Sequence, residues 1–500
     1  MRSPQCSVKP IANHDFQTIS REIFNRISRR NFLAGSAASL ASGPAWAQRG
    51  RSQPPSEPDC IIIGAGAAGI AAARRLRELG RSFLLVEASN RIGGRCYSET
   101  TSFGVPFDRG AHLIYNQDSN PISKIAARTG LDIAPAPSAQ RIRIGRRNAR
   151  ESELEDYLTA TVRASRAMQD ARLRGDPSAG SVIPKDLGDW QSTVEFALGP
   201  YLSGKDVGDV SATDISRADG RDAAAICRQG YGALIAKLAE GVPVQLDTAV
   251  KLVDIVNRGA KIELSTTKGS ITGKFCIITA STNAVLDRIK FDGELPKRHQ
   301  EALEKLRLGS FDHIALELAG NPLGLPRDEM VIEKSSGPRT AALVANVGGT
   351  PLSVVEVGGK FGRDLAAQGD KAMVDFAVEW LTNLFGPSVQ KAVKRTQVTQ
   401  WNKDPWAQGA VAAAAPGGQF ARRVLMEPIR GRVYFAGEAV HETAWGTVGG
   451  AWESGTRVAE AINRRVLGQP EPKQPETTSS NRSSTGNIDI VAPEPGRRRR

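Results

Sequence analysis

Three glycines spaced as G-x-G-x-x-G, Gly64, Gly66 and Gly69, directly follow the apolar run CIII at 60–63. A short β-branched run of this kind is typical of a buried parallel strand, and the residues after it have the pattern of a helix. In such a turn Gly64 permits the sharp bend, Gly66 lets the backbone approach a pyrophosphate, and Gly69 lets the helix pack closely on the strand. The helix N-terminus adds partial positive charge. The stretch therefore predicts a dinucleotide site.

A second predicted strand, SFLLVE at 82–87, ends on an acidic residue. Glu87 lies about 20 residues beyond the glycines, where a carboxylate accepts hydrogen bonds from ribose hydroxyls. Gly93 and Gly94 leave room for another close approach of the backbone, and Arg95 can neutralise a phosphate. Strand, glycine turn, helix and strand in this order predict an α/β fold of the Rossmann type.

Residues 87–95 read EASNRIGGR, which resembles the E-A-x-x-R-x-G-G-R segment of the FAD-containing amine oxidase family. Ser89 stands where many members have an arginine near the adenosine. The resemblance extends over most of 57–466, and its other matching segments are 107–115, 228–241, 244–255, 274–281, 400–410, 434–438 and 446–462.

The resemblance implies a Rossmann-type FAD-binding domain with an interleaved α+β substrate domain. We expect the FAD-binding domain at 57–112, 221–280 and 425–466, the substrate domain at 113–220 and 281–424, and a disordered tail at 469–500. It also implies the following cofactor-binding residues: Gly64, Gly66, Ala68, Gly69, Glu87, Gly93, Gly94, Arg95, His112, Leu113, Val250, Glu438, Thr447 and Val448.

Several positions near the expected chemistry depart from the family pattern. His313 stands where many members have a lysine that holds a water near flavin N5, so it either takes over that role or is a packed histidine at a strand start. The two positions that often carry an aromatic cage are Val411 and Ala444. Trp445 beside the second either forms one wall of the site or packs in the core. Ala410 replaces a cysteine that some members bond to the flavin, so the FAD is expected to be non-covalent.

His313 and Trp445 are therefore the candidate catalytic residues of an oxidoreductase. The resemblance implies that an amine or amino acid, with its nitrogen neutral, gives hydride from the adjacent carbon to flavin N5. The resulting imine is hydrolysed to a carbonyl. Oxygen, which would yield hydrogen peroxide, or another acceptor takes the electrons. Two alternatives stay open: a desaturase or isomerase of the phytoene desaturase type, suggested by Gly110-Ala111-His112, and a non-catalytic FAD-binding protein.

The N-terminal segment has the order of a twin-arginine export signal. Arg29 and Arg30 precede a modestly apolar stretch, and Ala45 to Ala47 form an A-x-A cleavage pattern. This predicts a protein exported already folded, to the periplasm or beyond. The apolar stretch is too short for a membrane span, and the sequence offers no other candidate.

Composition limits the remaining possibilities. The chain of 500 residues has a net charge of +13, but no compact Lys/Arg stripe with interleaved aromatics, so no nucleic-acid partner is expected. Its five cysteines form no CxxC pair, so no metal site is expected either. The sequence does not indicate an oligomeric state.

Overall fold

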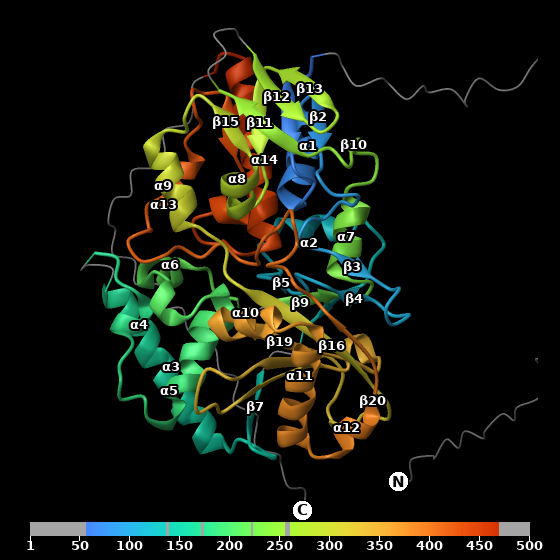
Figure 1. The fold of residues 1–500 in the computed structure, drawn as a ribbon, viewed down its shortest axis with the longest axis vertical. Helices are drawn as coiled ribbons and strands as arrows, with labels where there is room; N and C mark the ends of the chain where they lie inside the picture. Colours follow the sequence, from blue (N-terminus) through green and yellow to red (C-terminus); the bar gives the residue numbers. More distant parts are fainter. Residues whose placement is uncertain (1–56, 137–139, 172–174, 222–223, 256–260, 470–500) are drawn as a thin grey trace, which may run out of the picture. The chain divides into compact units, whose positions relative to one another are not determined.

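The computed structural model describes residues 57–136, 140–171, 175–221, 224–255 and 261–469 (Figure 1). The predicted export signal and, from residue 470, the predicted tail lie outside the described residues. The described residues belong to one compact unit. No helix in them is long and apolar enough to cross a membrane.

A five-stranded parallel sheet of order β10-β2-β1-β14-β21 forms the core of the predicted cofactor domain. Its strands are β1 (Cys60–Ile63), β2 (Phe83–Val86), β10 (Val244–Gln245), β14 (Phe275–Ile278) and β21 (Val433–Phe435). Residues of β1 and β14 are all buried, as expected for a sheet covered on both faces. The strands come from three distant parts of the sequence, and the predicted Rossmann-type fold is confirmed. The exact domain boundaries stay a prediction.

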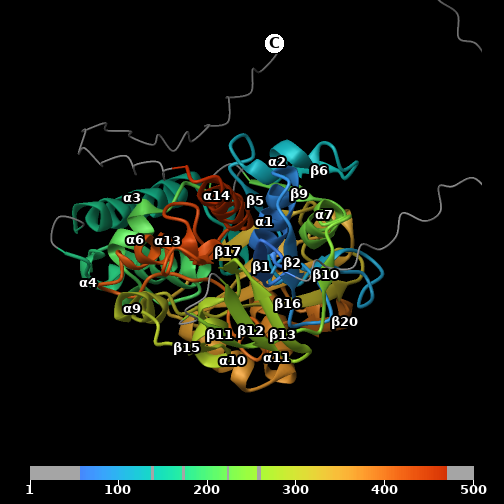
Figure 2. The same cartoon turned by 90° about the horizontal axis from the view of Figure 1, so that it is seen from above.

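Two helices pack together over this sheet. They are α1 (Ala67–Glu78), which begins in the glycine turn, and α14 (Val448–Val466), and both views place them side by side (Figures 1 and 2). A Cβ on Gly455 would lie 2.1 Å from the carbonyl oxygen of Ala68, so a side chain at this position would separate the two helices.

A four-stranded sheet of order β13-β12-β11-β15 packs on the other face of the parallel sheet and shares a hydrophobic core with it. Its strands are β11 (Val250–Asp254), β12 (Ile262–Thr266), β13 (Gly269–Gly273) and β15 (Lys290–Asp292). Helices α8 (Thr282–Arg288), α9 (Lys297–Lys305) and α13 (Ala421–Met426) contribute to the same core.

A seven-stranded sheet of order β20-β16-β19-β18-β17-β7-β8 dominates the predicted substrate domain. The strands are β7 (Gln140–Ile144), β8 (Arg147–Asn148), β16 (Phe311–Leu318), β17 (Glu329–Glu333), β18 (Ala342–Ala345), β19 (Leu352–Gly358) and β20 (Val393–Val398). Helices α10 (Gly359–Ala367), α11 (Asp370–Phe385) and α12 (Ser388–Ala392) accompany it. Strands β16 and β19 are buried along almost their whole length, so this sheet is covered on both faces there.

The remaining described elements are helical or short. The α-helices within 151–220 are α3 (Glu151–Ala171), α4 (Ala179–Val182), α5 (Gln191–Phe196) and α6 (Ala212–Arg217). Helices α2 (Pro121–Ala126) and α7 (Tyr231–Leu238) lie near two small sheets. These are formed by β5 (Ile114–Tyr115), β6 (Ile133–Pro135) and β9 (Ala224–Cys227), and by β3 (Ser98–Glu99) and β4 (Phe107–Asp108).

Candidate active site

A cavity of about 700 Å³ is lined by the glycine turn, by the N-terminal end of α14 and by β16 and β19 of the large sheet. It brings together most of the residues predicted from the sequence, namely Gly64, Gly66, Ala68, Glu87, Gly93, Gly94, Arg95, His112, Leu113, Val250, His313, Glu438, Thr447 and Val448. Gly69 and Trp445 do not line it.

The glycine turn has the geometry of a cradle for an anionic ligand. Gly64 has a φ of +102°, and a Cβ there would lie 2.7 Å from Thr279 Oγ1. A Cβ on Gly69 would lie 1.9 Å from the carbonyl oxygen of Gly64, so Gly69 acts through packing. A Cβ on Gly66 would contact no protein atom within 4 Å and would occupy ligand space, because Gly66 lines the cavity. The three glycines therefore fit the roles predicted for a pyrophosphate site.

Backbone N–H groups of the glycine turn and of the loop after β2 hold the Glu87 side chain in place. Its Oε2 accepts a hydrogen bond from the Ala65 N–H at 2.7 Å, and its Oε1 accepts one from the Ser89 N–H at 2.8 Å. The residue is buried, yet it borders the cavity. The Ser89 hydroxyl also donates to Oε1 at 2.8 Å, so Oε2 is the oxygen with a lone pair left to accept from a ribose.

Arg95 and Glu438 form an ion pair at the cavity wall, with 2.9 Å between Arg95 Nη1 and Glu438 Oε1. Arg95 also donates to the Ala410 carbonyl, while Glu438 Oε2 accepts from the N–H groups of Ala412 and Gly446. The pair thus ties the 410–412 segment to the loop before α14. Glu438 borders the cavity as predicted, but its carboxylate is already engaged in positioning these loops.

The N-terminus of α14 opens into the cavity, as predicted. Thr447 is the N-cap, and its Oγ1 accepts from the Gly450 N–H at 3.0 Å. Thr447 and Val448 both border the cavity. The partial positive charge of a helix N-terminus suits an electron-rich ring system that gains negative charge on reduction. With the glycine cradle and Glu87, this end of the cavity fits FAD.

Two histidines and one carboxylate meet in the same cavity. The strands β16 and β19 pair in a register that sets His313 opposite Glu356. His313 Nε2 lies 3.4 Å from Glu356 Oε1, and His112 Nε2 lies 3.5 Å from the same oxygen. His313 Nδ1 contacts the Asp108 carbonyl at 3.0 Å, which directs Nε2 at the carboxylate. Both Glu356 oxygens and His112 Nε2 are buried without a hydrogen-bond partner, so the cluster has free capacity for a ligand or a proton.

The surroundings shift the pKa values of this cluster in different directions. Burial raises the pKa of Glu356, but the two imidazoles outweigh this and leave it below its usual value. Burial lowers the pKa of His313, but attraction to Glu356 and the Asp108 carbonyl outweighs this and raises it. Burial lowers the pKa of His112. The arrangement therefore favours a proton on His313 and leaves His112 neutral. Burial also raises the pKa of Asp108 to about 6.

The same three side chains have the ligand types and spacing of a metal-binding group, which the cysteine pattern did not predict. Among the described residues, one nitrogen each from His112 and His313 and one oxygen of Glu356 lie within 4.8 Å of one another. Two imidazoles and a carboxylate are ordinary ligands of transition metals. Metal analysis of the purified protein distinguishes a metal site from a proton-accepting site.

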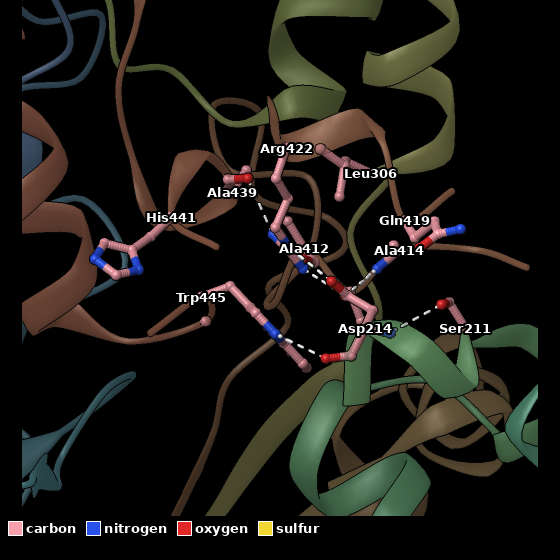
Figure 3. Close-up of polar contacts among 12 residues, drawn as sticks. Ser211, Asp214, Leu306, Ala412, Ala414, Gln419, Arg422, Ala439, His441 and Trp445 are labelled. Carbon is pink, nitrogen blue, oxygen red and sulfur yellow. Dashed lines mark hydrogen bonds and ion pairs between the residues drawn. The ribbon is translucent and has the colours of Figure 1, made fainter. Parts of the chain in front are cut away.

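Trp445 lies outside the cavity, so it is not a wall of the site; the packing alternative is correct. It is fully buried, and its Nε1 donates to the Asp214 carbonyl at 3.3 Å (Figure 3). Arg422 lies over its ring at 4.8 Å and forms a buried ion pair with Asp214 at 2.6 Å. The tryptophan therefore fixes the loop before α14 in the core. The amphipathic indole finds both an apolar environment and a hydrogen-bond partner there.

Glu356 and Arg221 border the cavity but were missed in the sequence. One signal was available for Glu356. It is the charged residue in the otherwise uncharged strand LSVVEVG, all of whose residues are buried. A charge is rarely buried unless it is paired or functional. For Arg221 no sequence signal distinguished it from the other arginines.

Comparison with known proteins identifies the family. A profile of the family described as flavin containing amine oxidoreductase matches residues 67–463. The chain belongs to this family. It is 27% identical over 446 residues to lysine-specific histone demethylase 2 of Homo sapiens, an alignment that covers 80% of this chain and 53% of the demethylase. It is 26% identical over 456 residues to polyamine oxidase 3 of Oryza sativa subsp. japonica, covering 82% and 90%.

The chain thus spans about half the length of that demethylase. Solved structures with the same fold include cyclohexylamine oxidase from Brevibacterium oxydans IH-35A, with a TM-score of 0.71, 20% identity, and coverage of 82% of this chain and 100% of that one. A putrescine oxidase bound to putrescine has a TM-score of 0.69 at 17% identity, covering 81% and 99%. Membership of the family makes this chain a flavin-dependent oxidoreductase with FAD as its cofactor.

Proposed function

We propose that this protein oxidises the C–N bond of an amine with non-covalently bound FAD. The observation that carries the proposal is the meeting, in one cavity, of a glycine cradle for the cofactor and the buried Glu356–histidine cluster. Family membership supports the same reaction class.

Residues of this chain would hold the FAD without a covalent bond. The turn at Gly66 and the N-terminus at Thr447 would receive the pyrophosphate and the ring system, and Glu87 the ribose. Ala410 offers no thiol, and burial raises the pKa of the nearby Cys96 well above its usual value, which keeps that thiol unreactive. When bound, FAD supplies the two-electron oxidant that takes hydride from the carbon next to nitrogen.

The Glu356 cluster would prepare the amine. An amine arrives largely as ammonium at neutral pH, and its nitrogen must lose a proton before its lone pair can assist hydride loss. Glu356, with both oxygens unpartnered, would attract the ammonium. His112 Nε2, unpartnered and neutral, would accept the proton. His313, hydrogen-bonded to the Asp108 carbonyl, would hold Glu356 in position.

The charged cluster favours an amine over the substrates of the desaturase alternative. A buried carboxylate and two imidazoles in the substrate end of the cavity would lose solvation against an apolar chain without gaining a partner. A scaffold role without catalysis would leave Glu356 buried and unpartnered for no benefit.

Export and the electron acceptor belong to the same proposal. The twin-arginine pattern suggests that the protein acts in the periplasm or outside the cell, and cell fractionation with antibody detection would test this.

Reduced FAD would pass its electrons to oxygen, giving hydrogen peroxide, or to another acceptor. A peroxide assay under air distinguishes the two.

The decisive experiment is anaerobic titration of the purified, FAD-loaded protein with a panel of amines and amino acids. We expect bleaching of the oxidised flavin band by one structural class, and slower bleaching in Glu356→Gln with unchanged FAD content. A flavin that stays oxidised with every compound would overturn the proposal. A stoichiometric metal ion that is lost in His112→Ala would contradict the proton-accepting role of the cluster.

A further inference from the structure

The substrate end of the cavity holds a second charged group, the guanidinium of Arg221. Its Nη1 donates to the Leu202 carbonyl at 3.2 Å and its Nη2 to the Trp445 carbonyl at 3.1 Å. A guanidinium has five N–H donors, so these bonds leave others free. No carboxylate of the described residues lies within 4.0 Å of Arg221. Within the described ranges, its positive charge therefore has no carboxylate partner in the cavity.

Glu356 is the negatively charged group in the same cavity. Its side chain is 1% exposed, both of its oxygens lack a hydrogen-bond partner, and its nearest cationic groups are imidazoles rather than Arg221. The charge of Glu356 is therefore balanced in part by the His313 imidazole, but both of its oxygens can still accept hydrogen bonds from an ammonium group. Among the described residues, Arg221 and Glu356 do not form an ion pair with each other.

Two tyrosines of the cavity interact with both charged groups. The Arg221 guanidinium lies 5.2 Å from the ring of Tyr115, and both Tyr115 and Tyr201 are within electrostatic reach of Arg221 and of Glu356. All four residues border the cavity. Arg221 and Glu356 therefore border one cavity, together with two tyrosines that interact with both charges.

We propose that the substrate is an amino acid, bound as a zwitterion with its carboxylate at Arg221 and its ammonium at Glu356. A guanidinium binds a carboxylate through paired N–H donors, which fixes orientation as well as charge. A simple amine would satisfy Glu356 but leave Arg221 unpaired. The inference rests on the proposed function and narrows its substrate class. It concerns substrate recognition and adds no chemical step.

Contacts with Trp445 would orient the Arg221 guanidinium before the substrate binds. The Trp445 carbonyl that it contacts belongs to the residue fixed by Asp214 and Arg422 (Figure 3). The Arg221 guanidinium lies 5.4 Å from the Trp445 ring as well. A guanidinium oriented before the ligand arrives loses less entropy on binding. The buried role of Trp445 and the recognition role of Arg221 are thus parts of one arrangement.

The test compares each amino acid with the amine that lacks its carboxylate. The panel covers aliphatic, aromatic, acidic and basic side chains, for example phenylalanine against 2-phenylethylamine. Binding is read from the shift of the flavin band, and reaction from anaerobic bleaching. We expect the best amino acid to exceed its amine by about tenfold or more in the ratio of reduction rate to dissociation constant. If amines match or exceed every amino acid, this inference falls while the proposed function stands. If no compound of either kind reduces the flavin, both fall.

Variants separate recognition from a structural effect. Arg221→Met keeps much of the side-chain length but removes the charge, and we expect it to lower the amino-acid-to-amine selectivity about tenfold to a hundredfold. Arg221→Lys, which keeps the charge without the paired donors, should fall between Met and wild type. Glu356→Gln should weaken the binding of amine and amino acid alike. If Arg221→Met lost FAD or failed to fold, Arg221→Lys alone would decide. Equal losses for amine and amino acid in the folded variants would overturn the proposal.

Discussion

At the scale of single residues, Gly66 and Gly69 separate cofactor binding from folding. A Cβ on Gly66 meets no protein atom within 4 Å, whereas a Cβ on Gly69 would clash with the Gly64 carbonyl at 1.9 Å. The φ of Gly66 is −76°, which any residue adopts without strain. A methyl group added at Gly66 would therefore obstruct the ligand, whereas one added at Gly69 would disturb the packing of the protein.

Gly66→Ala is expected to weaken FAD binding by about tenfold to a hundredfold, because the methyl group intrudes on the ligand and not on the protein. The melting temperature of the FAD-free protein should stay unchanged. Gly69→Ala is the matched control and should lower that melting temperature. Flavin content by absorbance and thermal unfolding of the apoprotein provide the two measurements. Full FAD content in folded Gly66→Ala would refute the assigned role of the turn.

The paired histidines predict two separate windows of pH-dependent stability. The pKa of His313 is raised in the folded state. Its contribution to the free energy of unfolding is therefore complete below pH 6.5 and is lost as the pH rises through the folded pKa. The pKa of His112 is lowered, so stability is lost as the pH falls from 6.5 through its folded pKa.

We therefore expect His313→Gln to flatten the fall in melting temperature above pH 6.5, and His112→Gln to flatten the fall below it. Each variant is compared with wild type over pH 5 to 9, so that the titration of groups remote from the cluster cancels. An unchanged slope above pH 6.5 in His313→Gln would show that the Glu356 contact does not stabilise the protonated imidazole.

At the scale of elements, the register of two strands and the contact of two helices determine the site. Pairing of β16 with β19 sets His313 opposite Glu356, and a shift of one residue would turn one of them to the other face of the sheet. Likewise, the close contact of α1 with α14 sets where the N-terminus at Thr447 opens.

Gly455→Ala tests the helix contact. The new Cβ would lie 2.1 Å from the Ala68 carbonyl, so the helices must separate, at a cost of about 1–3 kcal/mol in the free energy of unfolding. We expect lower stability together with weaker FAD binding, because both ends of the cofactor site lie on these helices. Glu453→Ala, at an exposed position of α14, is the control and should change the free energy of unfolding by less than about 0.5 kcal/mol. Normal FAD affinity in folded Gly455→Ala would mean that α14 can shift without affecting the site.

At the scale of the whole molecule, the sequence predicted what is encoded locally. The cradle of Gly64, Gly66 and Gly69 lies within six residues, so its spacing alone indicated its geometry. Glu356 could not be predicted as a partner of His313, because their meeting depends on sheet register. The sequence left both alternatives for Trp445 open, because its hydrogen-bond partner Asp214 is 231 positions away and no local pattern reports the contact.

The joining of α1 to α14 also sets the order of events during synthesis. Arg75 on α1 contacts Glu460 on α14, 385 positions later, and the edge strand β21 begins at Val433. A chain still emerging from the ribosome therefore carries its glycine turn long before the helix that completes the pocket exists. Contacts so distant in sequence form late and slowly. Cofactor loading consequently reports that translation has reached the final helix, and a prematurely terminated chain should emerge colourless.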